Sequence, residues 1–131
     1  MDEVYKFLKE LPTFYLATVE GDQPRVRPFG AIIQLEGKLW LVTSSKKPVY
    51  QQVARNPKAE MSGTDKDGNW IRVQTTLVAE DNRAAKVQLL EEYPTLKAVY
   101  APDDDHMTML SFNNTTATFC SFTSQPRAVT F

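Results

Sequence analysis

The order of hydrophobic and polar positions changes from a helical period to a strand period at Phe14. Before it, residues 1–12 carry apolar side chains at helical spacing and end at Pro12, which predicts a short amphipathic helix. After it, short apolar runs alternate with turn signals at residues 20–22 and 36–38. We expect these runs to form the four strands of a meander: FYLATV, PRVRPF, AIIQL and LWLVTS.

The rest of the chain continues the alternation of strands and short helices. Pro48 suits the first turn of a helix and Asn56-Pro57 suits its end, so PVYQQVAR is expected to be helical. The runs AEMSGT and WIRVQTTLVA follow as strands, and Asn82 is placed to cap a helix, RAAKVQLLEEY, that ends before Pro94. The tail predicts a hairpin, MTMLSF and TTATFCSF, with Asn113-Asn114 in its two-residue turn.

These segments add up to about eight short strands and three helices in a chain of 131 residues. A chain of this length usually forms one domain around one core, so we expect a single domain over residues 1–131. Many short antiparallel strands commonly close into a barrel, because closure removes exposed strand edges. The predicted fold class is therefore mainly β, a small β-barrel with short helices.

Charge, hydropathy and cysteine content each narrow the range of functions. The 15 basic and 16 acidic residues give a formal net charge of −1, so bulk charge predicts no nucleic-acid partner. No apolar run approaches the ~20 residues that cross a bilayer, and the first segment has no basic leader, so no membrane association is expected. Cys120 is the only cysteine and cannot form an internal disulfide, which agrees with a cytoplasmic protein.

One turn gathers hydroxyl and ammonium groups directly before the predicted helix at residues 48–55. A helix N-terminus presents unpaired N–H groups and a partial positive charge, so added hydroxyls and lysines favour a phosphate site there. The alternative is that Ser45 only caps the helix while both lysines are solvated. The residues of the turn are Thr43, Ser44, Ser45, Lys46 and Lys47.

A second cationic feature lies on the predicted strand PRVRPF. Arg25 and Arg27 are two residues apart, so their side chains point to the same face of the strand. One acceptor with several oxygens explains such a pair well, and the planar guanidinium matches phosphate. The alternative is that each arginine pairs with a surface acid such as Glu20 or Asp22.

Other polar and aromatic groups give weaker signals. Consecutive residues point in different directions, so for Asp103-Asp104-Asp105-His106 we expect a solvated loop, no metal site, and His106 at the surface. Cys120 is expected to be a buried apolar thiol. Large rings such as Trp70 and Phe122 fit either the core or a subunit contact. No Ser/His/Asp order or phosphate-loop motif is present, so no catalytic side chain is assigned.

The combination of these features resembles the pyridoxamine 5′-phosphate oxidase-related family of FMN-binding split β-barrels. The matching stretches are FYLATVEGDQPRVRPFG, LWLVTSSKKPVYQQVARNPKAEMSG and GNWIRV, which cover most of residues 14–73. The remaining elements agree with the family in their order. The combination of stretches, rather than any one of them, makes the resemblance specific.

The resemblance implies a homodimer that holds two FMN molecules at the subunit interface. By this similarity, the arginine strand lines the cofactor, with Arg27 at the ribityl-phosphate end, and the lysine turn holds the phosphate. The backbone at residues 42–43 runs along the isoalloxazine ring, Gln52 adds a polar contact, and Trp70 of the second subunit lies near the ring. The implied cofactor-binding residues are Arg25, Val26, Arg27, Val42, Thr43, Ser45, Lys46, Lys47, Gln52 and Trp70.

An FMN-dependent oxidoreductase is the function that the resemblance implies, acting on a small molecule with a nicotinamide or other reductant. FMN would supply the redox chemistry, so no catalytic side chain is needed. The pyridoxamine phosphate oxidases complete their substrate site with a C-terminal arginine and histidine. This chain ends QPRAVTF, with Arg127 but no following histidine. Reduction of a nitro compound or a quinone therefore suits it better than vitamin oxidation.

Two alternatives stay open at this point. The chain could bind or carry a flavin without turnover of its own, or the same barrel could hold haem or a deazaflavin. His106 is the only histidine, so haem would have a single imidazole ligand to choose from, which disfavours haem.

Overall fold

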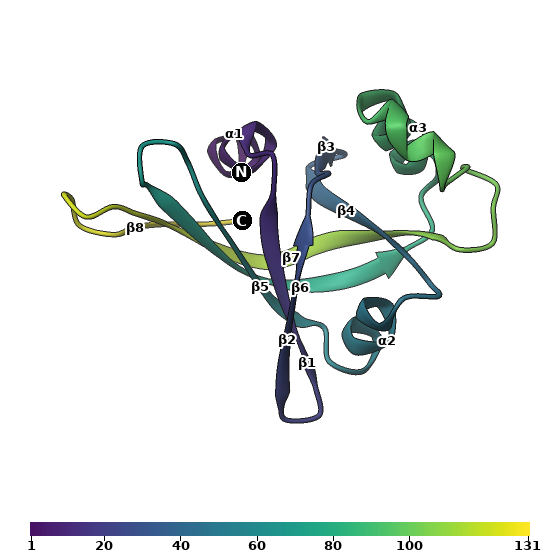
Figure 1. Ribbon diagram of the computed structural model, residues 1–131, viewed down its shortest axis with the longest axis horizontal. Helices are drawn as coiled ribbons and strands as arrows, with labels where there is room; N and C mark the ends of the chain where they lie inside the picture. Colours follow the sequence, from purple (N-terminus) through teal and green to yellow (C-terminus); the bar gives the residue numbers. More distant parts are fainter.

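A computed structural model describes residues 1–131 and shows one antiparallel sheet with short helices packed around it (Figure 1). The strands follow the order β2-β1-β5-β6-β7-β4-β3, and β8 pairs with β7. None of the helices is long and apolar enough to cross a membrane. The strands are β1 (Phe14–Glu20), β2 (Gln23–Phe29), β3 (Ile33–Leu35), β4 (Lys38–Ser44), β5 (Lys58–Thr64), β6 (Trp70–Glu80), β7 (Met107–Cys120) and β8 (Arg127–Thr130). The helices are α1 (Asp2–Glu10), α2 (Pro48–Arg55), α3 (Arg83–Glu92) and the 3₁₀ helix η1 (Pro94–Ala98).

Most elements predicted from the sequence are confirmed. The opening helix, the four strands of the first half, α2, β5, β6 and α3 all occupy their predicted segments. The predicted meander of the first four strands is wrong, because β2 pairs only with β1 and β3 only with β4, at opposite ends of the strand order. Asn82 caps α3, because its side-chain oxygen accepts a hydrogen bond from the N–H of Ala85 at 3.0 Å. The turn between β3 and β4 has positive φ at Glu36 (55°) and Gly37 (72°), the conformation that two-residue hairpin turns favour.

The predicted hairpin at Asn113-Asn114 is wrong. β7 is one continuous strand of 14 residues. Where β6 advances two residues, from Gln74 to Thr76, β7 advances three, from Asn113 to Thr116, so β7 contains an extra residue. Asn114 does adopt a positive φ (50°), but it forms a β-bulge instead of a turn. Most of the predicted second arm is therefore the second half of β7, and β7 pairs with the strand that follows it, β8.

The mainly β split-barrel class is confirmed, but the sheet is not a closed barrel. β2 and β3 each pair with only one neighbour, so they form two free edges. Pro24 and Pro28 in β2 have no N–H to donate, which protects that edge from pairing with a further strand. At this edge the two prolines limit strand pairing without barrel closure.

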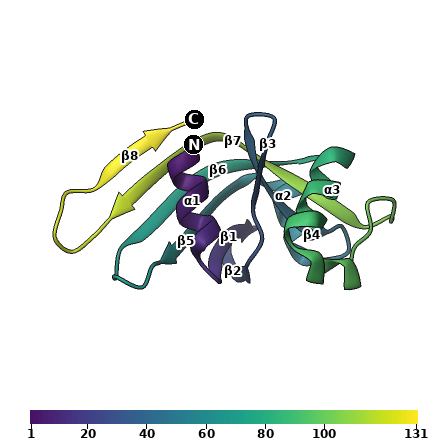
Figure 2. The same cartoon turned by 90° about the horizontal axis from the view of Figure 1, so that it is seen from above.

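β4 is buried on both faces because it separates two hydrophobic clusters. Leu39 and Leu41 pack in the larger cluster, with side chains from α1 and from the central strands. Trp40 and Val42 pack in the smaller cluster, together with side chains of α3. Figures 1 and 2 show α1 and α3 on the same side of the sheet, at separate positions along it. The end of β4 is therefore a rigid base for the turn that leads into α2.

Candidate functional site

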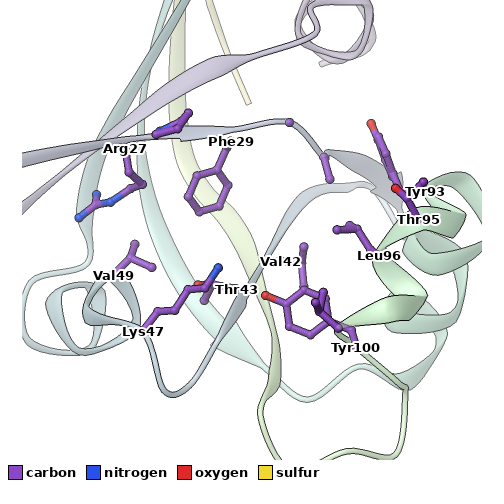
Figure 3. Close-up of a pocket in the computed structure, with 14 residues that line it drawn as sticks. Arg27, Phe29, Val42, Thr43, Lys47, Val49, Tyr93, Thr95, Leu96 and Tyr100 are labelled. Atoms are coloured by element: carbon purple, nitrogen blue, oxygen red, sulfur yellow. The ribbon is translucent and has the colours of Figure 1, made fainter.

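A pocket of about 390 Å³ lies where the end of β2, the end of β4, the start of α2 and the segment around η1 meet (Figure 3). We refer to it as the central pocket. Figure 3 shows Arg27 at one end, Tyr93 and Thr95 at the other, and Phe29 and Val42 between them. The lining residues are Arg27, Pro28, Phe29, Gly30, Ala31, Val42, Thr43, Lys47, Val49, Tyr93, Thr95, Leu96, Val99 and Tyr100.

A second pocket, of about 610 Å³, adjoins the central pocket at its cationic end. The two pockets share Arg27, Pro28, Lys47 and Val49 in their walls. We refer to the second one as the side pocket. It brings together β2 and the start of α2, the two segments whose cations the sequence singles out. Its other lining residues are Glu20, Arg25, Val26, Pro48 and Gln52.

Arg27 is held in place by three neighbouring groups. Its Nη1 donates to Thr18 Oγ1 (2.7 Å) and to the carbonyl of Leu16 (3.2 Å), and its Nη2 donates to Gln52 Oε1 (2.6 Å). Burial lowers the pKa of Arg27, but a guanidinium stays charged at neutral pH. Gln52 thus contacts Arg27, and the cation is oriented before any ligand binds, while the predicted contact of Gln52 with a cofactor stays a prediction.

Arg25 has a different environment. Its Nε and Nη2 donate to Glu20 Oε1 at 3.1 and 2.9 Å, and both side chains are about half exposed. For Arg25 the structure thus contains the alternative pairing with a surface acid. Val26, between the two arginines, is exposed. Arg25, Val26 and Arg27 all line the side pocket. Their contact with a cofactor stays a prediction.

The turn between β4 and α2 presents Lys47 to both pockets, whereas Ser45 and Lys46 line neither. Lys47 is the N-cap residue of α2, and no side chain caps the helix, so capping by Ser45 is wrong. Ser44 organises the turn instead, because its Oγ accepts a hydrogen bond from the N–H of Lys46 at 3.2 Å. A direct role of Ser45 and Lys46 in binding stays a prediction.

Comparison with known proteins places this arrangement in a family. The family model described as "Pyridoxamine 5′-phosphate oxidase" matches residues 1–119. The chain belongs to the pyridoxamine 5′-phosphate oxidase family. A comparison with curated proteins finds no match.

Solved structures with the same fold have diverse names. A NimC/NimA family protein from Clostridium acetobutylicum is 44% identical, with a TM-score of 0.96 over 100% of this chain and 92% of that chain. A heme binding protein from Mycobacterium smegmatis is 14% identical, with a TM-score of 0.72 over 91% of this chain and 52% of that chain. An F420 reductase is 23% identical, with a TM-score of 0.60 over 83% of this chain and 91% of that chain. At these identities the last two show the fold alone.

Thr43 carries the only buried side-chain oxygen or nitrogen that lacks a hydrogen-bond partner. The residue is 2% exposed and lines the central pocket. An unpaired buried hydroxyl costs about 1–3 kcal/mol, so it is expected to gain a partner when a ligand enters. The cationic end, the apolar wall and this unpaired hydroxyl together fit FMN, the flavin that membership in the pyridoxamine 5′-phosphate oxidase family suggests.

Replacement of Thr43 by valine should affect the free protein and the complex in opposite directions. Valine has nearly the same shape and removes the unpaired hydroxyl, so the free energy of unfolding should rise by about 0.5–1 kcal/mol. Affinity for FMN should fall about fivefold, because one hydrogen bond is lost. Denaturant unfolding and flavin fluorescence titration measure the two effects. Thr43→Ser, which keeps the hydroxyl, is the matched control, and a less stable Thr43→Val protein would contradict the unpaired state.

The apolar wall of the central pocket was not predicted from the sequence. Phe29 comes from the end of β2, and Tyr93, Leu96 and Tyr100 come from the segment around η1. The Tyr93 hydroxyl anchors this segment to Ile32, accepting from its N–H and donating to its carbonyl, both at 3.2 Å. Two tyrosines after the third helix were a signal in the sequence, but no local pattern places them opposite β4.

Trp70 lies away from both pockets of its own chain. It begins β6 and packs on Phe122, with the ring centroids 5.1 Å apart. The turn between β5 and β6 is at the far end of the sheet from α2 (Figure 1). Contact between Trp70 and a ligand in the central pocket therefore requires a second chain, as the resemblance implies.

The acidic loop before β7 is not a uniformly solvated run. Asp103 pairs with Arg83 at 3.0 Å on the surface. His106 is not the surface residue that the sequence suggests, because only 25% of its side chain is exposed and its Nδ1 lies 3.2 Å from Ser44 Oγ. The loop therefore packs its last residue against the end of β4.

Two further residues that the sequence singles out lie outside the pockets. Cys120 is buried, as expected for an apolar thiol. Arg127 pairs with Glu3 of α1, and its guanidinium lies over the ring of Phe119, 4.6 Å from the ring centroid. Arg127 is thus engaged with α1 and β7 and does not reach the central pocket.

Proposed function

We propose that this protein is an FMN-dependent oxidoreductase that binds its flavin in the central pocket and works as a homodimer. The observation that carries the proposal is the wall of that pocket. It joins two cations, Arg27 and Lys47, to an apolar slot that contains the unpaired hydroxyl of Thr43. Membership in the pyridoxamine 5′-phosphate oxidase family supports the same ligand.

The boundary between the two pockets suits the phosphate of FMN. A phosphate monoester carries close to two negative charges near pH 7. Arg27 offers a planar donor group whose orientation is already set by Thr18 and Gln52. Lys47 adds a second positive charge from the opposite wall. Two cations from different elements can both neutralise and orient the phosphate.

The apolar part of the central pocket suits a flat ring. Phe29, Val42 and Leu96 offer side chains without polar atoms, which exclude water from the face of a bound ring. Burial raises the pKa of Tyr100, and the charge of Asp104 raises it further, so the hydroxyl stays protonated at neutral pH. FMN, when bound, supplies the hydride or electron transfer, while these side chains bind, orient and shield it.

An exposed aromatic pair supports the homodimer. Phe122 is 90% exposed, and its ring packs against the ring of Trp70. Aromatic side chains of this kind are enriched at interfaces, because their burial against a partner is favourable. A second copy of the chain would cover this pair. It would also place Trp70 of one subunit near the central pocket of the other, which Trp70 does not reach within its own chain.

The proposed substrate is a small, flat electron acceptor such as a nitro compound or a quinone, with a reduced nicotinamide as reductant. Arg127 pairs with Glu3, packs on Phe119 and lines neither pocket of its own chain. This supports a substrate without a phosphate of its own. It argues against oxidation of a pyridoxamine phosphate.

Titration of the purified protein with FMN and with riboflavin tests the ligand. The two flavins have the same ring and differ in the phosphate, so FMN should bind about a hundredfold more tightly if Arg27 and Lys47 hold that group. Quenching of flavin fluorescence gives both dissociation constants. Equal affinities would contradict the phosphate site, and a protein that binds neither flavin would overturn the proposed function.

Turnover separates an enzyme from a flavin carrier. With FMN bound, the protein should oxidise a reduced nicotinamide in the presence of a nitroaromatic compound or a quinone, measured by loss of nicotinamide absorbance. FMN binding without turnover would identify a carrier. Parallel titrations with haem and with a deazaflavin test the remaining ligands, because solved proteins of the same fold are named for them.

A further inference from the structure

His106 links two segments that border the central pocket. On one side, its Nδ1 is 3.2 Å from Ser44 Oγ, and its carbonyl accepts the N–H of Ser45 at 2.8 Å. On the other side, its ring packs against the ring of Tyr100, with the centroids 5.5 Å apart. One residue therefore contacts both the turn that carries Lys47 and the aromatic wall.

Asp104 fixes the His106 ring from behind. Its carboxylate accepts hydrogen bonds from the N–H groups of Ala101 (2.9 Å), His106 (3.0 Å) and Met107 (2.6 Å). Desolvation raises the pKa of Asp104, but these three bonds and the His106 ring outweigh it and lower the pKa to about 2. The carboxylate is therefore charged at neutral pH, with Oδ2 3.3 Å from His106 Nε2.

The two ring nitrogens of His106 face different partners. Nε2 lies 3.3 Å from the Asp104 carboxylate, and Nδ1 lies within hydrogen-bond distance of the Ser44 hydroxyl, at 3.2 Å. Ser44 Oγ accepts in turn from the N–H of Lys46 at 3.2 Å, and the Ser44 carbonyl accepts from the N–H of Lys47 at 3.0 Å. A chain of polar contacts thus runs from Asp104 through His106 to the turn before α2.

We propose that His106 is a positioning residue for the ligand site, which holds the Ser44–Lys47 turn and the Tyr100 ring in their binding positions. The inference rests on the proposed function and adds a residue that does not line the central pocket. A lysine side chain is long and flexible, so the place of its ammonium group depends on the backbone of its turn. Loosening that turn adds an ordering cost to binding without removing any direct contact.

Three substitutions of His106 separate the two contacts of its ring. In His106→Asn the amide oxygen can take the place of Nδ1 and accept from Ser44, whereas the contact with Asp104 is lost. In His106→Gln the amide reaches the position of Nε2 and keeps Asp104, whereas the contact with Ser44 is lost. His106→Ala loses both contacts.

The affinity for FMN should depend on whether the side chain at position 106 keeps its hydrogen bond with Ser44. His106→Ala and His106→Gln should bind FMN about five- to tenfold more weakly than the wild type, and His106→Asn should lie within about twofold of it. Ser44→Ala combined with His106→Ala should be no weaker than the weaker single variant, because the two residues act through one hydrogen bond. Asp105→Ala, an exposed neighbour in the same loop, is the matched control and should leave affinity unchanged.

Amide hydrogen exchange of the protein without ligand gives a second readout. The N–H groups of Lys46 and Lys47 should exchange about tenfold faster in His106→Ala and close to the wild-type rate in His106→Asn. Wild-type exchange and wild-type FMN affinity in His106→Ala would overturn this inference and leave the proposed function intact. Equal weakening in His106→Asn and His106→Ala would overturn it as well. A wild-type protein that binds no FMN would instead overturn the proposed function, and with it the claim on affinity.

Discussion

Replacement of Arg27 by alanine is expected to lower the affinity for FMN about a hundredfold, because a desolvated cation that meets a phosphate contributes several kcal/mol. The guanidinium is oriented by Thr18 and Gln52 and lies on the boundary of both pockets. Riboflavin, which has no phosphate, should lose far less affinity. The ratio of the two dissociation constants should therefore collapse in Arg27→Ala. Fluorescence titration with both flavins measures this ratio.

Arg27 also hydrogen-bonds within the fold, so its loss could act through stability alone. Thermal unfolding of the ligand-free variant separates this effect from the loss of the phosphate contact. Arg55→Ala removes an equal charge from an exposed position at the end of α2 and should bind FMN like the wild type. Arg27→Lys keeps the charge but lacks the planar guanidinium, so its affinity for FMN should lie between those of Arg27→Ala and the wild type. Parallel losses for FMN and riboflavin in Arg27→Ala would contradict the phosphate role.

Local patterns were sufficient to predict most elements of the fold. The periodicities of the first half, the proline before α2 and the Asn82 cap each act over a few residues, so the sequence shows them directly. The Asn113-Asn114 signal is also local, but a positive φ serves a β-bulge as well as a hairpin turn. The choice between them was made by pairing with β6, a partner far away in the chain.

The cationic end of the candidate site could be predicted for the same reason, and the apolar end could not. Arg27 and Lys47 stand beside recognisable signals, a paired-arginine strand and a helix start. Tyr100 and His106 meet β4 and its turn only because β4 and β7 pair in the sheet. The His106 contact with Ser44 joins residues 62 positions apart, and no spacing in the sequence reports it.

Lys46 and Lys47 should contribute unequally, although the sequence offers them as a pair. Lys47 lines both pockets, whereas Lys46 lines neither. We expect Lys47→Ala to weaken FMN binding about twentyfold, because it removes a charge-assisted contact with the phosphate.

Lys46→Ala is the matched control for that variant, since it removes the same charge one residue away from an equally exposed position. It should change affinity by less than about threefold at physiological salt, where exposed charges beyond direct contact are largely screened. Titrations at low and high salt check this difference between the two lysines, because high salt screens long-range attraction more strongly than a direct contact with the phosphate. Equal losses in the two variants would mean that the turn attracts the phosphate only through its net charge, and the specific place assigned to Lys47 would be wrong.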